Sequence, residues 1–127
     1  MKKYIFIGLF FFLATSANAE TYTATVKRVI DGDTVETHLL IDTYFKLHMD
    51  VTIRLARINC PEVTGEEKTK GLKVKTLVTS KLPVGTKIAL SSLKKDKYGR
   101  TVAELAFDGI NLNDFLLQGG FCEEYVE

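Results

Sequence analysis

The sequence has no surplus of charge of either sign, no repeat and no long low-complexity stretch. Its 17 lysines and arginines nearly balance its 16 aspartates and glutamates, which gives a formal net charge of +1. The overall charge therefore gives no sign of a polyanionic partner, and any contact with nucleic acid has to come from local clusters. With no linker in view, we expect a single domain.

No apolar stretch reaches the roughly 20 residues needed to cross a membrane. The main apolar run follows Lys2 and Lys3, extends from Tyr4 to Ala14, and leads into the small residues 16–19. A basic start, a short apolar run and a small-residue cleavage site are typical of a signal peptide. We therefore expect residues 1–19 to be removed after Ala19, giving a periplasmic or secreted protein without stable membrane association.

Cysteine is scarce, and the two cysteines lie in the expected mature chain, residues 20–127. In an exported protein, an even pair such as Cys60 and Cys122 suggests a disulfide rather than a redox or zinc site. The leader holds two basic and no acidic residues, so the formal charge of the mature chain falls from +1 to −1. Its length suits one small hydrophobic core.

Short strand patterns dominate the mature chain. Thr, Val and Ile are frequent in the first two patterns, and the third has an apolar residue at every second position, which indicates a strand with one buried face. A helical spacing follows, with Leu72, Val74, Leu77 and Val78 on one side. The order β-β-β-α-β-β-α is typical of a small closed barrel of the OB type with helices, an α+β fold. The predicted strands are 21–30, 34–40, 45–55, 86–93 and 100–107, and the predicted helices are 72–82 and a short one ending at 117.

The stretch IDGDTVE, residues 30–36, places two aspartates and a glycine between strand patterns. Taken alone, the D-G-D sequence is best explained as a strand bend or bulge. An EF-hand is excluded because the next ligand position after Asp33 holds Val35, and no nearby His or Cys suggests zinc or iron. A site for a hard cation remains, with Asp33 giving one carboxylate and other segments completing the shell.

A second polar cluster is RLARINCPE, residues 54–62. Arg54 lies in a strand pattern, where ordering a long side chain is costly unless it has an anionic partner. Asn59 and Glu62 follow where the chain leaves the barrel wall. The alternative interpretation is an ordinary loop start with solvated charges.

The third cluster is KKDKYGR, residues 94–100. A tight turn with Asp96 and Gly99 explains its spacing, and basic turns are common. It also gathers Lys97, Tyr98 and Arg100, and proteins recognise phosphates with Lys and Arg and stack bases on aromatic rings. The three clusters together supply two carboxylates and two arginines, the groups that phosphodiester hydrolysis requires beside a cation.

Three motifs in this order resemble the staphylococcal (micrococcal) nuclease, or thermonuclease-like, family. They are V-I-D-G-D-T-V at 29–35, R-L-x-R-I-N-C-P-E at 54–62 and D-K-Y-G-R at 96–100, and the segment 113–120 resembles the family's N-x-x-L-x-x-G. The resemblance extends from about Ala24 to Gly120. It implies a five-stranded OB barrel and calcium-dependent hydrolysis of DNA and RNA, with 3′-phosphate products.

The resemblance also implies a calcium site. Asp33 and Asn59 would be side-chain ligands, and Cys60 would add its backbone carbonyl. Asp31 and Gly32 would shape the backbone that presents Asp33. Because the family has an aspartate where this chain has Asn59, we expect weaker calcium binding.

The remaining motif residues would act on the substrate. By resemblance, Glu62 would position or deprotonate the attacking water, and Arg54 and Arg100 would clamp the phosphate and stabilise the transition state. Lys97 and Tyr98 would hold a terminal phosphate or nucleotide.

The sequence ends before the family's third helix and the tyrosines that flank the nucleotide; Tyr125 is a candidate to replace one of them. Either the domain is short and braced by a disulfide, or the sequence is a truncated form. In the family's barrel the segment after the second helix returns beside the metal loop, so we expect Cys60 and Cys122 to be bonded rather than two buried thiols.

The favoured interpretation is an exported, monomeric, calcium-dependent nuclease acting on DNA and RNA. The alternative is an inactive nucleic-acid-binding or protein-binding module on the same fold. The presence of Arg54, Glu62 and Arg100 favours the enzyme, because a pure binding module does not need a carboxylate beside the phosphate. His38 and His48 have no partner at ligand spacing and are interpreted as ordinary strand or loop residues.

Overall fold

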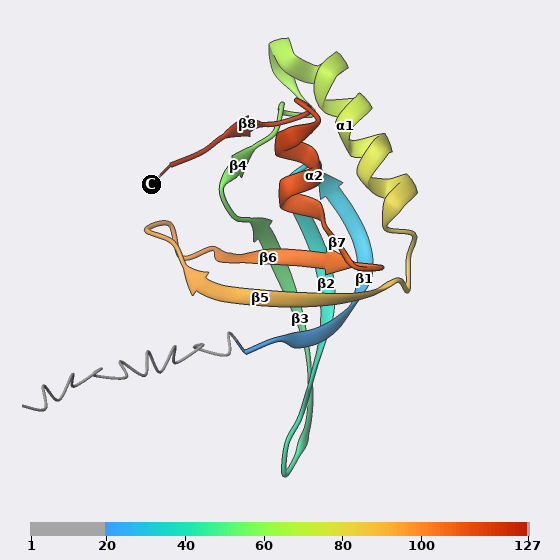
Figure 1. The fold of residues 1–127 in the computed structure, drawn as a ribbon, viewed down its shortest axis with the longest axis vertical. Helices are drawn as coiled ribbons and strands as arrows, with labels where there is room; N and C mark the ends of the chain where they lie inside the picture. The colour runs from blue at the N-terminus through green and yellow to red at the C-terminus, as the bar shows by residue number, and fades with distance from the viewer. Residues whose placement is uncertain (1–19, 127) are drawn as a thin grey trace, which may run out of the picture.

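The computed structural model describes residues 20–126, and the predicted signal peptide lies outside the described residues. Five long strands follow one another in space in the order β3-β2-β1-β5-β6, and a parallel pairing of β3 with β6 closes them into a barrel (Figure 1). The predicted five-stranded OB barrel is confirmed. The strands are β1 (Tyr22–Asp31), β2 (Thr34–Asp42), β3 (Lys46–Leu55), β5 (Lys87–Lys95) and β6 (Thr101–Phe107).

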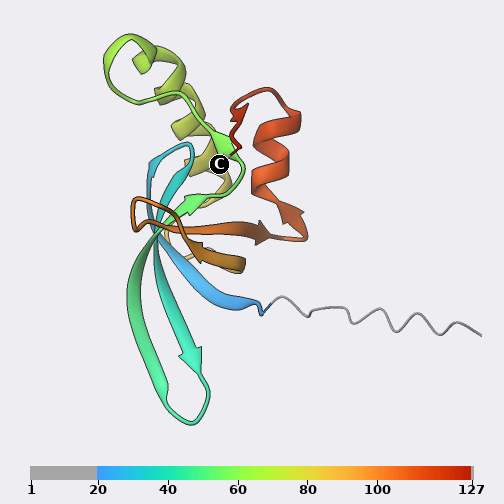
Figure 2. The ribbon, with the colours of Figure 1, turned by 90° about the vertical axis from the view of Figure 1, so that its left-hand side faces the viewer.

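Two α-helices and several short elements complete the described residues. Helix α1 (Lys68–Lys81) follows a 3₁₀ turn, η1 (Gly65–Glu67), and packs against β1, while α2 (Leu112–Gln118) packs against β6 (Figures 1 and 2). Helix α1 begins before the predicted residue 72, and three short strands were not predicted. These are β4 (Ile58–Asn59), β7 (Ile110–Asn111) and β8 (Glu123–Glu124). Within residues 20–126 no helix is long and apolar enough to cross a membrane.

A buried asparagine connects α2 to the barrel. The Asn113 side chain is fully buried, and its Nδ2 donates to the carbonyls of Ala56 and Ala103 at 2.9 and 3.1 Å. Its Oδ1 accepts from the Leu105 N–H at 3.0 Å. These bonds fix α2 across the end of β6 and give the buried amide hydrogen-bond partners on both its nitrogen and its oxygen.

The β2–β3 hairpin departs from the predicted buried face of residues 45–55. Ile53 is fully buried, but Phe45, Leu47 and Met49 on the same side of the strand are 75%, 56% and 49% exposed. The first half of β3 extends with β2 beyond the barrel, so no other described element covers it (Figure 2). Alternation therefore predicted the strand correctly but the burial of its first half wrongly.

The apolar stripe predicted for α1 is also partly wrong. Val74 and Val78 are buried as expected, whereas Leu72 is 43% exposed and Gly71 is buried instead. The reason lies in the loop that precedes the helix. A Cβ on Gly71 would collide with the backbone carbonyl of Glu62, so this helix position faces that loop at a distance only glycine allows.

Candidate active site

The IDGDTVE stretch forms the turn of a β-hairpin, and the pairing of β1 with β2 shifts register, as at a β-bulge, between Val29 and Asp31. Asp31 pairs with Thr34, which leaves Gly32 and Asp33 as a two-residue turn between β1 and β2. Gly32 does not have a left-handed φ. A Cβ at this position would lie 2.6 Å from Val74 Cγ1 and 3.1 Å from Cys60 Cβ, so glycine is needed for space. The turn is thereby pressed against α1 and the cysteine.

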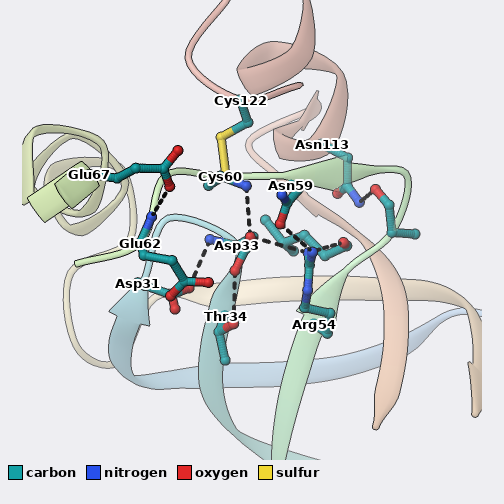
Figure 3. Close-up of a disulfide and its surroundings, with 12 residues drawn as sticks. Asp31, Asp33, Thr34, Arg54, Asn59, Cys60, Glu62, Glu67, Asn113 and Cys122 are labelled. Carbon is teal, nitrogen blue, oxygen red and sulfur yellow. Dashed lines mark hydrogen bonds and ion pairs between the residues drawn. A yellow bond between two sulfur atoms is a disulfide. The ribbon is translucent and has the colours of Figure 1, made fainter. Parts of the chain in front are cut away.

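The Asp33 carboxylate is buried and held from three directions. Its Oδ2 accepts from the Cys60 N–H at 2.8 Å and lies 3.4 Å from Arg54 Nη1, and its Oδ1 accepts from the Thr34 hydroxyl at 3.0 Å (Figure 3). Burial raises the pKa of Asp33 to about 6, and the Asp31 carboxyl contributes in the same direction. The Asp33 carboxyl thus lies buried beside a second carboxyl, where a cation would favour its ionised form.

Arg54 has the anionic partner that its position in a strand required. The side chain is only 9% exposed, and Nη1 donates to the Leu55 carbonyl at 2.9 Å. Its Nη2 donates to Asn59 Oδ1 at 3.4 Å. The guanidinium therefore touches both Asp33 and Asn59, the two predicted side-chain ligands.

The segment that carries Asn59 and Cys60 is fixed by a short sheet and a disulfide. Strand β4 pairs with β8 through Ile58 with Glu124 and Asn59 with Glu123. Cys60 and Cys122 form a disulfide at the end of this pairing (Figure 3), which confirms the predicted bond. The backbone of Cys60 therefore stays beside Asp33.

Glu62 lies in the exposed loop after Cys60. Its backbone N–H donates to Glu67 Oε2 at 3.1 Å, and its backbone carbonyl rests against Gly71 of α1. Figure 3 shows the Glu62 side chain pointing from this loop toward the turn that carries Asp31 and Asp33. Sequence analysis assigned no role to Gly71, although a glycine inside a helical pattern often has a packing reason.

Arg100 ends the β5–β6 turn, which is organised by Asp96 as predicted. Asp96 accepts from the N–H groups of Tyr98 and Arg100 at 2.9 and 2.8 Å and from Arg100 Nε at 2.6 Å. The bond to Asp96 raises the pKa of the Arg100 guanidinium, and Asp33 adds to this shift through its charge. Tyr98 is 67% exposed, with the Arg100 guanidinium 5.1 Å and Lys97 Nζ 5.2 Å from its ring centre.

Arg54 and Arg100 meet at one cavity of about 480 Å³, here called the arginine cleft. Tyr125 and Lys94 also line it, and the Tyr125 N–H donates to the Arg57 carbonyl at 2.8 Å. The family resemblance left the position of Tyr125 open, and nothing in the sequence except its charge pointed to a role for Lys94. Lys97 and Tyr98 do not line the cleft, although the Tyr98 ring lies against the Arg100 guanidinium at its edge.

The donors around Asp33 suit a hard cation by their chemistry. No group of three His, Cys, Asp or Glu side chains is arranged for a metal ion anywhere in residues 20–126. Apart from the Arg54 guanidinium, which cannot be a metal ligand, the side chains there offer oxygen atoms, from the carboxyls of Asp31 and Asp33 and from the Asn59 amide. Oxygen-only ligand sets are those that Ca²⁺ prefers.

Comparison with known protein families gives a match. The family described as "Staphylococcal nuclease homologue" matches residues 52–127, more than half of the chain. The matched range contains the motifs at 54–62 and 96–100, whereas the turn at 31–33 precedes it. A search of curated proteins found no match.

Proposed function

The chain belongs to the staphylococcal nuclease homologue family, and from this we propose that it is a calcium-dependent nuclease that hydrolyses phosphodiester bonds of DNA and RNA. The observation that carries the proposal is the meeting of Arg54 and Arg100 at one cleft, next to the buried Asp33 carboxylate. Two guanidinium groups match the geometry and charge of a phosphate. The neighbouring carboxylates supply oxygen donors for a cation.

In the proposed reaction, Arg54 and Arg100 bind the non-bridging oxygens of the scissile phosphate and stabilise the charge that develops on them. Arg54 is held by the Leu55 carbonyl and Asp33, so its guanidinium group is oriented before substrate binds. Glu62 takes a proton from the attacking water or orients that water. Its exposed loop position leaves its carboxylate accessible to solvent.

Asp33, Asn59 and the Cys60 carbonyl would hold Ca²⁺. When bound, the ion would supply positive charge to the phosphate and lower the pKa of a coordinated water. Asn59 provides an oxygen without a formal charge, so the affinity would be lower than with a second aspartate.

We also propose that the protein acts outside the cytoplasm, as a monomer, after removal of residues 1–19. N-terminal sequencing of the exported protein checks the cleavage, which should leave Glu20 first. A retained leader would contradict it.

The second candidate is a binding module that has lost activity, and the Asn59 amide at a predicted ligand position is the observation that favours it. One experiment separates the two. Purified protein is incubated with DNA or RNA in calcium or in chelator, and products are resolved and tested for 3′-phosphate ends. Calcium-dependent cleavage supports the nuclease, whereas binding without cleavage under any divalent ion supports the module.

Variants test the assigned roles. Glu62→Gln and Arg100→Ala should each lower turnover by about 10²-fold or more while the fold stays intact, because each removes a group that acts in the transition state. Glu66→Gln, in the same exposed region, and Arg28→Ala, an exposed arginine of β1 that pairs with Glu36 and lines neither the cleft nor the turn, serve as matched controls and should keep full activity. Full activity of Glu62→Gln or Arg100→Ala would contradict the proposed mechanism.

A further inference from the structure

Arg54 and Arg100 line a second hollow besides the arginine cleft. This hollow has a volume of about 610 Å³ and lies between the β2–β3 hairpin and the end of the β5–β6 ribbon. We call it the hairpin groove. Its other lining residues include Leu39, Met49, Val51, Leu93, Lys95 and Thr101.

The cleft and the groove lie on opposite faces of the β5–β6 ribbon. Lys94 pairs with Val102, and both line the arginine cleft. The next pair along the ladder, Lys95 with Thr101, lines the hairpin groove. Successive residues of a strand point to opposite faces, so the two hollows flank the ribbon, and the two arginines are common to both.

The groove combines an apolar wall with positive charge. Leu93, Val51 and Met49 supply apolar surface, and Met49 remains 49% exposed although it faces the barrel side of the hairpin. Lys95 lies at the groove beside the shared arginines, where its Nζ donates to the Thr101 hydroxyl at 2.7 Å. An apolar surface next to cations suits a nucleotide, whose base and sugar need covering while its phosphate needs a counter-charge.

The hairpin wall is held in place from its polar side. Asp50, the only carboxylate among the described residues that line the groove, is bonded to Lys27 Nζ at 2.7 Å and to His38 Nδ1 at 2.8 Å. His38 Nε2 also lies 3.1 Å from His48 Nδ1, a cross-strand contact that spacing in the sequence did not indicate. These contacts offset the negative charge of Asp50 and keep the strand that carries Met49 in position.

Building on the nuclease function proposed above, we propose that the hairpin groove binds the nucleotide on one side of the scissile phosphate. The polynucleotide strand then crosses the end of the β5–β6 ribbon at Arg54 and Arg100. The apolar wall covers any base equally, so this subsite binds without sequence preference.

The test measures binding of a fluorescently labelled eight-nucleotide single-stranded DNA by anisotropy, in chelator so that no cleavage occurs. Met49→Asp should raise the Kd at least tenfold, because it places a carboxylate beside the bound strand. Leu47→Asp is the matched control: it adds the same charge two residues away on the same exposed face, outside the groove, and should change the Kd less than twofold. Equal effects of the two variants would overturn the proposal.

A second pair of variants covers the case in which Met49→Asp disturbs the hairpin. Lys95→Ala should weaken binding and reduce the slope of log K against log salt by about 0.7, the value for one phosphate contact on a single strand. Lys87→Ala, at the other end of β5, should leave both unchanged. Identical salt slopes for Lys95→Ala and wild type would count against the groove.

The experiments distinguish a failure of the groove proposal from a failure of the proposed nuclease function. If wild-type protein cleaves DNA but Met49→Asp and Lys95→Ala bind DNA like their controls, the groove proposal is wrong and the proposed nuclease function remains. If no cleavage occurs under any divalent ion while these two variants still lose binding, the groove stands as part of a binding module.

Discussion

Asn59 decides how strongly the proposed site holds a cation, because it brings an oxygen without a charge to a position beside Arg54 and close to Asp33. Asn59→Asp should tighten calcium binding on the order of tenfold, since a formal negative charge returns to the ligand set. Isothermal titration calorimetry measures this. Gln118→Glu is the matched control, because it makes the same change from amide to carboxylate at an exposed position of α2.

An unchanged or weaker calcium affinity in Asn59→Asp would show that Asn59 is not a ligand, or that the site is built around its amide. The wild-type contacts show how a carboxylate at this position could fail to bind calcium. Arg54 already donates to the Asn59 oxygen at 3.4 Å. If the new carboxylate pairs with Arg54 instead of calcium, the melting temperature in chelator should rise while the calcium affinity stays unchanged.

Helix α1 positions the Glu62 loop through Gly71, whose missing side chain lets the helix touch the Glu62 carbonyl. Replacing an interior helical glycine with alanine normally stabilises a helix by about 0.5–1 kcal/mol. Here Gly71→Ala should instead lower the melting temperature and reduce turnover more than tenfold, because it displaces the loop that carries the proposed base. Binding of DNA in chelator should stay within twofold of wild type, since the arginines are untouched.

Steady-state kinetics and anisotropy together check this prediction. Thr76→Ala, at an exposed position of the same helix, controls for a general change in helix stability and should leave turnover unchanged. A Gly71→Ala protein with a higher melting temperature and full turnover would contradict the positioning role.

The sequence predicted the strands and helices better than the burial of their side chains. The order of five strands and two helices, the Asp96 turn and the disulfide were predicted correctly. The exposed half of β3 was not, because alternation shows which side chains share a face but not whether another element covers that face. The burial of Gly71 and the exposure of Leu72 in α1 were mispredicted for a similar reason. The prediction oriented the helix by its large apolar residues, whereas in the structure contact with the Glu62 loop buries the glycine.

At the scale of the whole molecule, the site is assembled from segments far apart in the chain. The motifs named Asp33, Arg54 and Arg100, and the barrel brings them together because β3 pairs with both β2 and β6. The two hollows that flank the arginines were not predictable, since they depend on the register of the β5–β6 ladder and on where the β2–β3 hairpin leaves the barrel. Tyr125 reaches the cleft only because β8 pairs with β4.

The Cys60–Cys122 disulfide links that β4–β8 pairing to the rest of the fold, across a sequence separation of 62 residues. In the chain-entropy model, closing a loop of this length is worth on the order of 4 kcal/mol, a large share of the roughly 5–15 kcal/mol that stabilises a typical domain. Reduction should therefore lower the melting temperature by more than about 10 °C. It should also weaken calcium binding and nuclease activity, because the Cys60 N–H that orients Asp33 lies next to the broken bond.

Calorimetry, calcium titration and DNA cleavage, each with and without reductant, measure these effects, and intact mass after alkylation establishes the state of the thiols. The double variant Cys60→Ser, Cys122→Ser is the control: it should resemble the reduced wild type and should not respond to reductant. Two alkylated thiols in the unreduced, denatured wild type would show that the bond does not form. A reductant effect that persists in the double variant would show that the reagent acts elsewhere. Loss of stability with calcium affinity unchanged would mean instead that the disulfide braces the domain without orienting Asp33, because the β4–β8 hydrogen bonds then suffice to hold the Cys60 backbone in place.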